Sequence, residues 1–417
     1  MENVAARIVP LLRSKGKRQM KRFIWLLALL VAAVPAWCTK KITVGQLEEM
    51  LRSMNQDKKS DTDVATALKQ VELSEQLTVA RMNSLVSYVP GAKTTEQIYV
   101  LEARSAMLPP PADDLPSTLA PDAAAQQAIL AKAADYVTKT YQQLTKMTVT
   151  KTTLRFQDNV EAVAASSGIK GSATEVVTTA GFANAGSFIH YINSTEATIA
   201  SERGAEKLPS EKDKTPWGAN RMIALQEPDP SLGMVYTEAQ AAGTLKWLRW
   251  ETVNGKQVAV YTFEVPQKKS RMALNVCCFP DITQTGVAHF YTATTASAMG
   301  GTGGGGGVVG NFQTNTNWHN FKSSVPYHGE LFIEPTTGIV VRMITMAELK
   351  PSEEVHQVDT RVDYGPVKVG QQTLIVPVKT FVITNVVPNG DSGVGTYTER
   401  NTLFTSEYKN YQLSGRK

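Results

Sequence analysis

The sequence has little of what builds metal and redox sites: three cysteines and five histidines in 417 residues. Cys277 and Cys278 are adjacent, so in a strand their side chains point to opposite faces. Three states stay open for them: a disulfide to Cys38, a strained vicinal disulfide, or unpaired thiols. We expect no metal site and no cofactor.

The body of the chain lacks an excess of charge of one sign. The formal net charge is +5, but seven of the 43 basic residues and one of the 38 acidic residues lie in residues 1–36. The rest of the chain therefore carries 36 basic and 37 acidic side chains, a net charge of −1. Because nucleic-acid binding requires a basic face on the folded domain, we expect no nucleic-acid partner.

The leader lacks an apolar run long enough to cross a bilayer. Residues 23–34 are twelve apolar residues, whereas a crossing needs about 20. Two basic residues precede this run, and a proline and an alanine follow it, which is the order of a secretory signal peptide. We predict that residues 1–36 are cleaved before Trp37 and that the protein is exported to the periplasm or the periplasmic side of the cell envelope.

Three alternatives stay open at the N-terminus. Translation starts at Met1 or at Met20, since Met20 and the two basic residues after it make a complete leader. Cys38 follows the hydrophobic segment as a lipid-modified cysteine does, although Trp37 stands where a small residue is expected. The third alternative is an uncleaved anchor. Contact with the membrane is expected to be peripheral only.

Helical periodicity marks the next part of the chain, residues 43–107, where we predict four short helices, the last from Thr95 to Met107. The other three carry the apolar stripes Leu47, Met50, Leu51 and Met54; Val64, Leu68 and Val71; and Leu77, Met82 and Leu85. We therefore predict a helical module over residues 37–108.

Five prolines within residues 109–121 exclude a helix and a central strand there, so this segment is predicted to be an extended connector. One long helix is predicted to follow, from Pro121 to Met147, with Pro121 in its first turn and Ile129, Val137 and Leu144 on one side.

From Thr148 onward, β-branched and aromatic residues alternate with polar ones, which is typical of strands. Hairpins are predicted over residues 246–265, 327–344 and 362–383, the first with its turn at Asn254 and Gly255. Further strands are predicted over residues 148–157, 188–203, 271–279, 287–294 and 396–413. About ten to twelve strands are too many for one flat open sheet, so strong curvature or barrel-like closure is expected. The fold class is α+β, with residues 122–417 as the long helix and β domain.

Two insertions interrupt the strands. Residues 204–220 are charged and contain proline, as expected of a surface excursion. Residues 300–310 hold eight glycines but lack the lysine and hydroxyl residue of a phosphate-binding loop, so we predict a mobile loop.

Catalytic motifs are absent: there is no nucleophile elbow, paired-carboxylate motif or cysteine–histidine pattern. Two acid–base groupings are conceivable, although such residues on strands and loops are ordinarily solvated. They are His328 with Glu330 and Glu334, and His356 with Glu353 and Asp359. We therefore do not expect an enzyme.

The densest aromatic group lies in the first hairpin and consists of Trp247, Trp250, Tyr261 and Phe263. On the second strand, Tyr261 and Phe263 share a face with Ala259 and Val265 by alternation. Packing in the core of the hairpin is the ordinary role of such residues, and lining a ligand site is the sharper hypothesis.

Several segments resemble a large family of uncharacterised exported bacterial proteins. They are residues 72–77, 108–111, 136–156, 247–251, 259–270 and 362–365. The resemblance covers most of the mature chain and implies export, but it assigns no site residues.

The β portion also resembles the outer-membrane lipoprotein carrier superfamily and its periplasmic sensor relatives. The similar segments are residues 327–331 and 334–339, then Tyr364-Gly365 and the hairpin through Val376-Pro377. The resemblance implies a half-open antiparallel barrel with helices against its concave side, which holds acyl chains or lipoprotein segments. We expect an envelope protein that binds a lipid, acyl chain or lipoprotein segment. The first alternative is a structural or interaction protein without a small-molecule ligand, whose N-terminal helices bind an envelope partner. An envelope hydrolase is the third possibility.

Overall fold

The computed structural model describes residues 40–141, 144, 146–158, 188–202, 205–206, 224–225, 230–280, 318–386 and 400–413. The chain divides into two units, residues 1–40 and residues 41–417, and the second unit is described below. The predicted signal peptide, Cys38, the strand over residues 287–294, the glycine loop and most of the 204–220 excursion lie outside the described residues, as do the side chains of Cys277 and Cys278.

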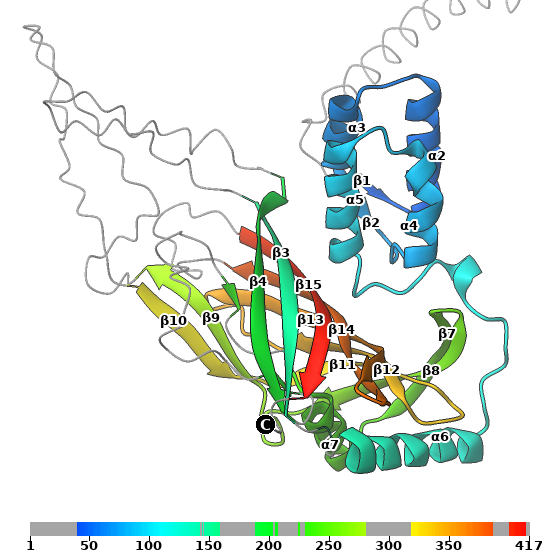
Figure 1. Ribbon diagram of the computed structural model, residues 1–417, viewed down its shortest axis with the longest axis vertical. Helices are drawn as coiled ribbons and strands as arrows, with labels where there is room; N and C mark the ends of the chain where they lie inside the picture. The colour runs from blue at the N-terminus through cyan, green and yellow to red at the C-terminus, as the bar shows by residue number, and fades with distance from the viewer. Residues whose placement is uncertain are drawn as a thin grey trace, which may run out of the picture. The chain divides into compact units, whose positions relative to one another are not determined.

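The helical segment contains the four predicted α-helices, with a short strand between the second and the third (Figure 1). They are α2 (Val44–Gln56), α3 (Asp61–Leu68), α4 (Val79–Leu85), which continues as the 3-10 turn η1 (Val86–Tyr88), and α5 (Ala92–Arg104). The side chains of Thr43, Ser60 and Thr78 cap α2, α3 and α4 by accepting a backbone N–H bond three residues on.

The prediction that Val71 extends a helical stripe is wrong. Helix α3 ends at Leu68, and Val71 opens the short strand β2 (Val71–Leu73), which pairs with β1 (Lys40–Ile42). Val71 and Leu73 are buried on either side of Glu72, which is the period of a strand and not of a helix.

The connector over residues 109–121 is extended apart from one 3-10 turn, η2 (Ala112–Asp114). The carbonyl of Pro109 accepts a bond from the Gln76 amide (2.8 Å), and Asp114 pairs with Arg81. Further along, the Leu119 carbonyl accepts a bond from Trp250 Nε1 (2.8 Å). The connector is thus bonded both to the helical segment and to the first hairpin. The division into residues 37–108, 109–121 and 122–417 stays a prediction.

The predicted helix from Pro121 to Met147 is too long. Helix α6 (Ala123–Asp135) is capped by Asp122, which places Pro121 before the first turn, and it ends in the π-helical turn η3 (Tyr136–Thr140). Met147 instead opens strand β3 (Met147–Gln157). Threonines accumulate after Tyr136, and their branched side chains disfavour a continued helix. Ile129, Val137 and Leu144 are nevertheless all buried in one core cluster.

Helix α7 (Leu232–Ala242) was not predicted, because the chain after residue 148 has the composition of strands. It begins after Ser231 and ends at Gly243, whose φ of 72° lets its amide bond to the Ala239 carbonyl. The glycine end signal and the alanine-rich last turns are present in the sequence.

Ten strands form one antiparallel sheet in the order β5-β4-β3-β15-β14-β13-β12-β11-β8-β7. Besides β3, its strands are β4 (His190–Glu202), β5 (Ala205–Glu206), β7 (Lys246–Val253), β8 (Lys256–Val265), β11 (Tyr327–Ile333), β12 (Val340–Ala347), β13 (Val355–Val369), β14 (Gln372–Val386) and β15 (Arg400–Leu413). A second sheet, in the order β10-β9-β6, contains β6 (Ala224–Leu225), β9 (Ala273–Pro280) and β10 (Trp318–Ser324).

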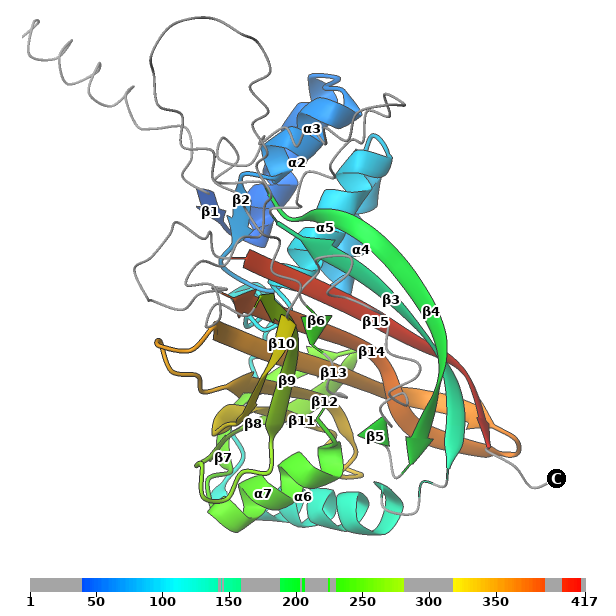
Figure 2. The ribbon, with the colours of Figure 1, turned by 90° about the vertical axis from the view of Figure 1, so that its left-hand side faces the viewer.

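All three predicted hairpins are present, and Asn254 and Gly255 have the positive φ values that their two-residue turn requires. The long strands bend along their length (Figure 2). Neither sheet closes among the described residues, since β5 and β7 remain as the two ends of the larger one. The α+β class is confirmed, and barrel-like closure is not seen.

Alternation gives the large sheet two distinct faces. The inner face carries Tyr261, Leu331 and Met343 and packs against α6, η3 and α7. The outer face carries Phe332 and Phe381, and here α5 lies against β14, β15 and β4. The predicted common face of Ala259, Tyr261, Phe263 and Val265 is the inner one.

Candidate functional site

The first hairpin brings together the four aromatic residues predicted to line a ligand site. A register shift between Trp247 and Arg249 places Trp247 and Trp250 on the inner face, although they are three residues apart. The Trp247 ring lies edge-on to Trp250 (4.8 Å between centroids) and to Tyr261 (5.7 Å). Tyr261 and Phe263 are fully buried, whereas both tryptophans are half-buried. A ligand-lining role for these residues stays a prediction.

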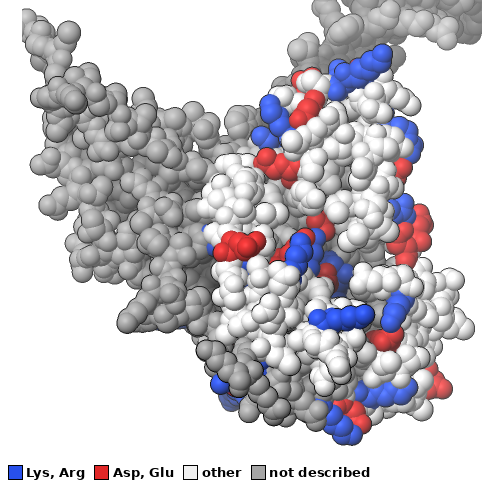
Figure 3. Space-filling view, viewed as in Figure 1, with Lys and Arg blue, Asp and Glu red and all other residues white. Residues whose placement is uncertain are grey.

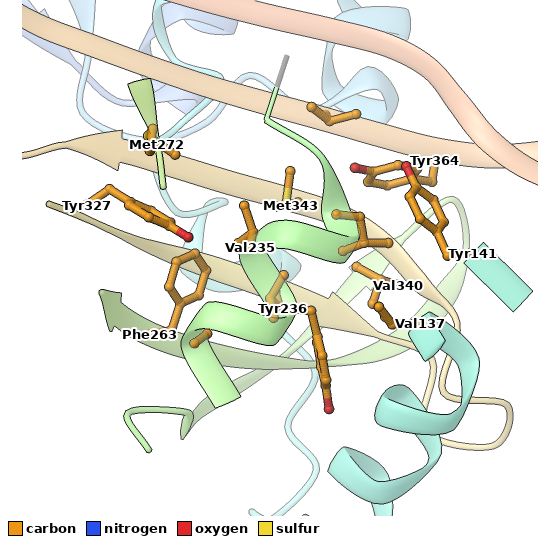
Figure 4. Close-up of a cluster of buried hydrophobic side chains, with 14 of the residues drawn as sticks. Val137, Tyr141, Val235, Tyr236, Phe263, Met272, Tyr327, Val340, Met343 and Tyr364 are labelled. Carbon is orange, nitrogen blue, oxygen red and sulfur yellow. The ribbon is translucent and has the colours of Figure 1, made fainter. Parts of the chain in front are cut away.

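Helix α7 covers part of the inner face. In Figure 4, Val235 and Tyr236 lie between Phe263 on one side and Val137 on the other. Four residues of α7 are at most 1 % exposed: Leu232, Val235, Tyr236 and Ala239. The helix is therefore an integral part of the core.

A buried carboxylate fixes α7 to the sheet. Glu238 is 4 % exposed and accepts a hydrogen bond from the Tyr327 hydroxyl (2.8 Å) and another from Arg271 Nε (2.7 Å). Burial is the main cause that raises the pKa of Tyr327 well above its ordinary value, and the hydrogen bond to Glu238 raises it further. The hydroxyl therefore stays protonated and donates to Glu238.

A cavity of about 20 Å³ lies on the inner face among β3, β4, β13, β14 and β15. Its walls are Val149, Ile199, Ser201, Glu206, Pro230, Val362, Tyr364, Pro377, Tyr408 and Tyr411. Most of these side chains are apolar or aromatic. The volume is enough for a water-sized group and far too small for an acyl chain.

The polar side of this cavity is electrically balanced. Lys151 Nζ pairs with Glu206 Oε2 at 2.8 Å and lies 5.4 Å from the centre of the Tyr408 ring. The Tyr411 hydroxyl donates to the Pro377 carbonyl (2.6 Å). Because Lys151 is paired with a carboxylate, the cavity favours an uncharged or apolar group.

A row of polar side chains crosses the same face. Gln157 of β3, Thr402 of β15 and Thr384 of β14 stand opposite one another, and they are 4 %, 1 % and 0 % exposed. Their strand neighbours Phe156 and Leu403 belong to the outer face, so alternation directs the row inward. Gln157 Oε1 and both threonine hydroxyls have no hydrogen-bond partner among the residues that the structure describes. We call these three residues the polar row.

The outer face carries a network of charges that sequence analysis missed. Asp363 accepts bonds from Arg342 Nε (2.6 Å) and Arg361 Nη2 (2.7 Å), and Arg361 Nη1 donates to the Ala106 carbonyl (3.1 Å). Burial alone would raise the pKa of Asp363, but the two guanidinium groups outweigh it and hold this pKa well below its ordinary value. Nearby, Lys379 pairs with Glu102 of α5 (2.7 Å).

An aromatic ring of the outer face packs against two of the arginine side chains. Arg342 and Arg249 lie 5.2 and 5.9 Å from the centre of the Phe332 ring, and Arg249 also pairs with Glu251 and Glu330. Cation–π contacts of this kind strengthen when they are desolvated. The network ties α5 and the segment after it to the sheet.

The two conceivable acid–base groupings are divided among other partners. His328 Nδ1 lies 2.5 Å from Glu348, whereas Glu330 pairs with Arg249 and Glu334 with Lys256.

In the second grouping, Asp359 accepts a bond from Gln357 (2.5 Å), while His356 is exposed. Burial raises the pKa of Asp359 to about 6, against the opposing effect of the hydrogen bond from Gln357. Among the described residues, the members of neither grouping form a hydrogen bond or an ion pair with one another.

Comparisons of the chain with protein-family models, curated proteins and solved structures found no match. Within the described ranges, no three His, Cys, Asp or Glu residues are arranged to hold a metal ion, and no helix is both long and apolar enough to cross a membrane. Basic and acidic side chains are interspersed on the face drawn in Figure 3.

The inner-face cavity and the polar row were not predicted as sites. The cavity contains three tyrosines that are distant in the sequence from the aromatic hairpin: Tyr364, Tyr408 and Tyr411. Tyr364 meets the other two only because β14 pairs with both β13 and β15. Threonine is common in strands for packing reasons, so Thr384 and Thr402 gave no signal of their own.

Proposed function

We propose that this chain is an exported binding protein of the cell envelope, which accommodates a lipid, acyl chain or lipoprotein segment on the inner face of a half-open sheet. The support is a bent antiparallel sheet with two separate ends, whose inner face is apolar over β8, β11, β12 and β13 and carries helices α6 and α7. The resemblance of the closing hairpins to the lipoprotein carriers agrees with this use.

The observation that carries the proposal is the cavity beside Val149 and Ile199. It belongs to the same core cluster as the aromatic hairpin, and its walls are mostly apolar. An apolar group that enters it exchanges water for hydrocarbon contacts. A longer chain requires α7 or another covering segment to shift, because the cavity of about 20 Å³ holds only a water-sized group.

A second candidate function, a structural or interaction protein of the envelope, is favoured by the same small volume and by the firm attachment of α7 through Glu238. In the helical segment, Val79 and Val86 are 54 % and 66 % exposed. They offer apolar surface to a partner. In this case the inner face is simply the core.

The two candidates are separated by enlarging the cavity. Val149→Ala removes two methyl groups from its wall, and Val258→Ala removes two from the outer face, where Val258 is equally buried. We expect Val149→Ala to increase the affinity for dodecanoic acid in calorimetric titration severalfold, whereas Val258→Ala leaves it unchanged. Organic extraction of the purified wild type, followed by mass spectrometry, should yield a bound lipid.

Absence of lipid in the extract and of dodecanoic acid binding in all three proteins contradicts the carrier proposal and favours the interaction protein. Equal gains in both variants would mean that loosened packing, and not the cavity, admits the fatty acid.

A further inference from the structure

Within the described part of the chain, the polar row has no hydrogen-bond partner on the inner face. Its three side chains come from adjacent strands in direct register, and each is at least nine-tenths buried. A buried hydroxyl or amide oxygen that makes no hydrogen bond destabilises the fold, and such atoms are rare in native proteins. Three of them lie side by side without a partner among the described residues, so a hydroxyl-bearing group bound there would gain hydrogen bonds.

The chemistry of the row defines that group. A threonine hydroxyl both donates and accepts, and Gln157 Oε1 only accepts. A neutral group with several hydroxyls matches this set, since each of its oxygens donates one bond and accepts others. The hydrogen-bonding chemistry of the polar row therefore matches that of a sugar or glycerol moiety.

The row also lies in line with the cavity. Thr402 and Tyr408 are on the same face of β15, six residues apart, which is about 20 Å along an extended strand. Between them, Ser406 bonds to Thr153 of the neighbouring strand (2.9 Å). The inner face thus has the mostly apolar cavity at one end and the polar row at the other, with the buried Arg155 and Phe404 between them.

We propose that Gln157, Thr384 and Thr402 bind the hydroxyl-rich headgroup of an amphiphile, such as a glycolipid, whose apolar part occupies the cavity side of the inner face. This inference rests on the proposed function and names its ligand class. The same chemistry is present in a free saccharide, which the test below distinguishes.

The test titrates the full mature chain calorimetrically with three probes: octyl glucoside, 1-octanol and methyl glucoside. Octyl glucoside is kept below its critical micelle concentration. We expect octyl glucoside to bind at least tenfold more tightly than 1-octanol. The double variant Thr384→Val, Thr402→Val should lose about tenfold in octyl glucoside affinity, as two lost hydrogen bonds predict, and keep its octanol affinity.

The control is Thr360→Val, an equally buried inner-face threonine outside the row. It should retain the wild-type affinity for octyl glucoside. The double variant is expected to fold, because removing hydroxyls that have no partner does not destabilise a core. Its thermal unfolding, measured alongside, should be at least as high as that of the wild type.

Equal binding of octyl glucoside and octanol, or no loss in the double variant, overturns the headgroup site and leaves the proposed function standing. Methyl glucoside binding that depends on the row, without octanol binding, supports a saccharide site and overturns the lipid-binding function. If no probe binds, both are overturned.

Discussion

The inner and outer faces of the large sheet are built from the same strands but held by different forces. Along β13, Val358 and Val362 point into the apolar inner core, whereas Arg361 and Asp363 point into the charged network of the outer face. Apolar burial is nondirectional and tolerates small shifts. A buried ion network depends on every partner, because each missing group leaves a charge uncompensated. The outer face should therefore be the more sensitive to single substitutions and to pH.

The largest expected effect comes from Asp363→Ala. It leaves Arg342 and Arg361 buried without their shared carboxylate, so we expect the free energy of unfolding in urea to fall by about 3–5 kcal/mol. The adjacent inner-face change Val362→Ala should cost about 2 kcal/mol. A smaller loss for Asp363→Ala than for Val362→Ala would show that the outer face is also held by apolar packing.

A second effect is on the pH dependence of stability. The folded pKa of Asp359 is raised from 3.8 to about 6, so between these values the native state binds a proton that the unfolded state does not. Lowering the pH through this window should stabilise the fold by up to roughly 3 kcal/mol. The pKa of Asp363 is lowered, so its contribution is present above the unfolded value and is lost on further acidification.

Urea unfolding of the wild type and of Asp359→Asn at intervals from pH 7 to pH 3 isolates the first carboxylate. The difference between the two curves should change between pH 6 and 4 and be flat elsewhere. Parallel curves throughout would mean that Asp359 titrates as an ordinary exposed carboxyl.

The smallest expected effect compares two glycine turns with positive φ. A side chain at Gly338 would overlap the backbone of Lys132 in α6, which covers the inner face, whereas Gly370 has open space around it. Gly370→Ala should cost about 1 kcal/mol for the left-handed backbone alone. Gly338→Ala should cost more than about 2 kcal/mol in thermal unfolding. Equal destabilisation by the two substitutions would show that the turn at Gly338 moves away from α6 at little cost in free energy.

Local signals predicted much of this architecture. Asn254 and Gly255 specify a two-residue turn by their backbone preferences, and the alternation in β8 correctly placed Tyr261 and Phe263 on one face. The α6 boundary failed because Leu144 continues the helical apolar spacing although the helix has ended, so burial alone does not reveal which backbone places a residue in the core.

The candidate sites were far less predictable, because they depend on contacts between distant segments. Asp363 meets Arg342 through the register of two strands, and Gln157 reaches Thr402 only when β3 pairs with β15. The aromatic hairpin was visible in advance because its members are close in sequence. The bulge that turns Trp250 to the same face as Trp247 could not be predicted from strict alternation.

The placement of β3 between β4 and β15 has a consequence for how the chain folds. The first long strand of the sheet acquires one of its two neighbours only from residues 402–413, some 245 residues later. Strands so far apart in the sequence pair slowly, because the entropy cost of closing a large loop comes before any stabilising contact forms. Until β15 arrives, β3 and β14 each have an unpaired edge that invites association with other chains. A nascent chain should accordingly depend on holding factors until β15 has been synthesised.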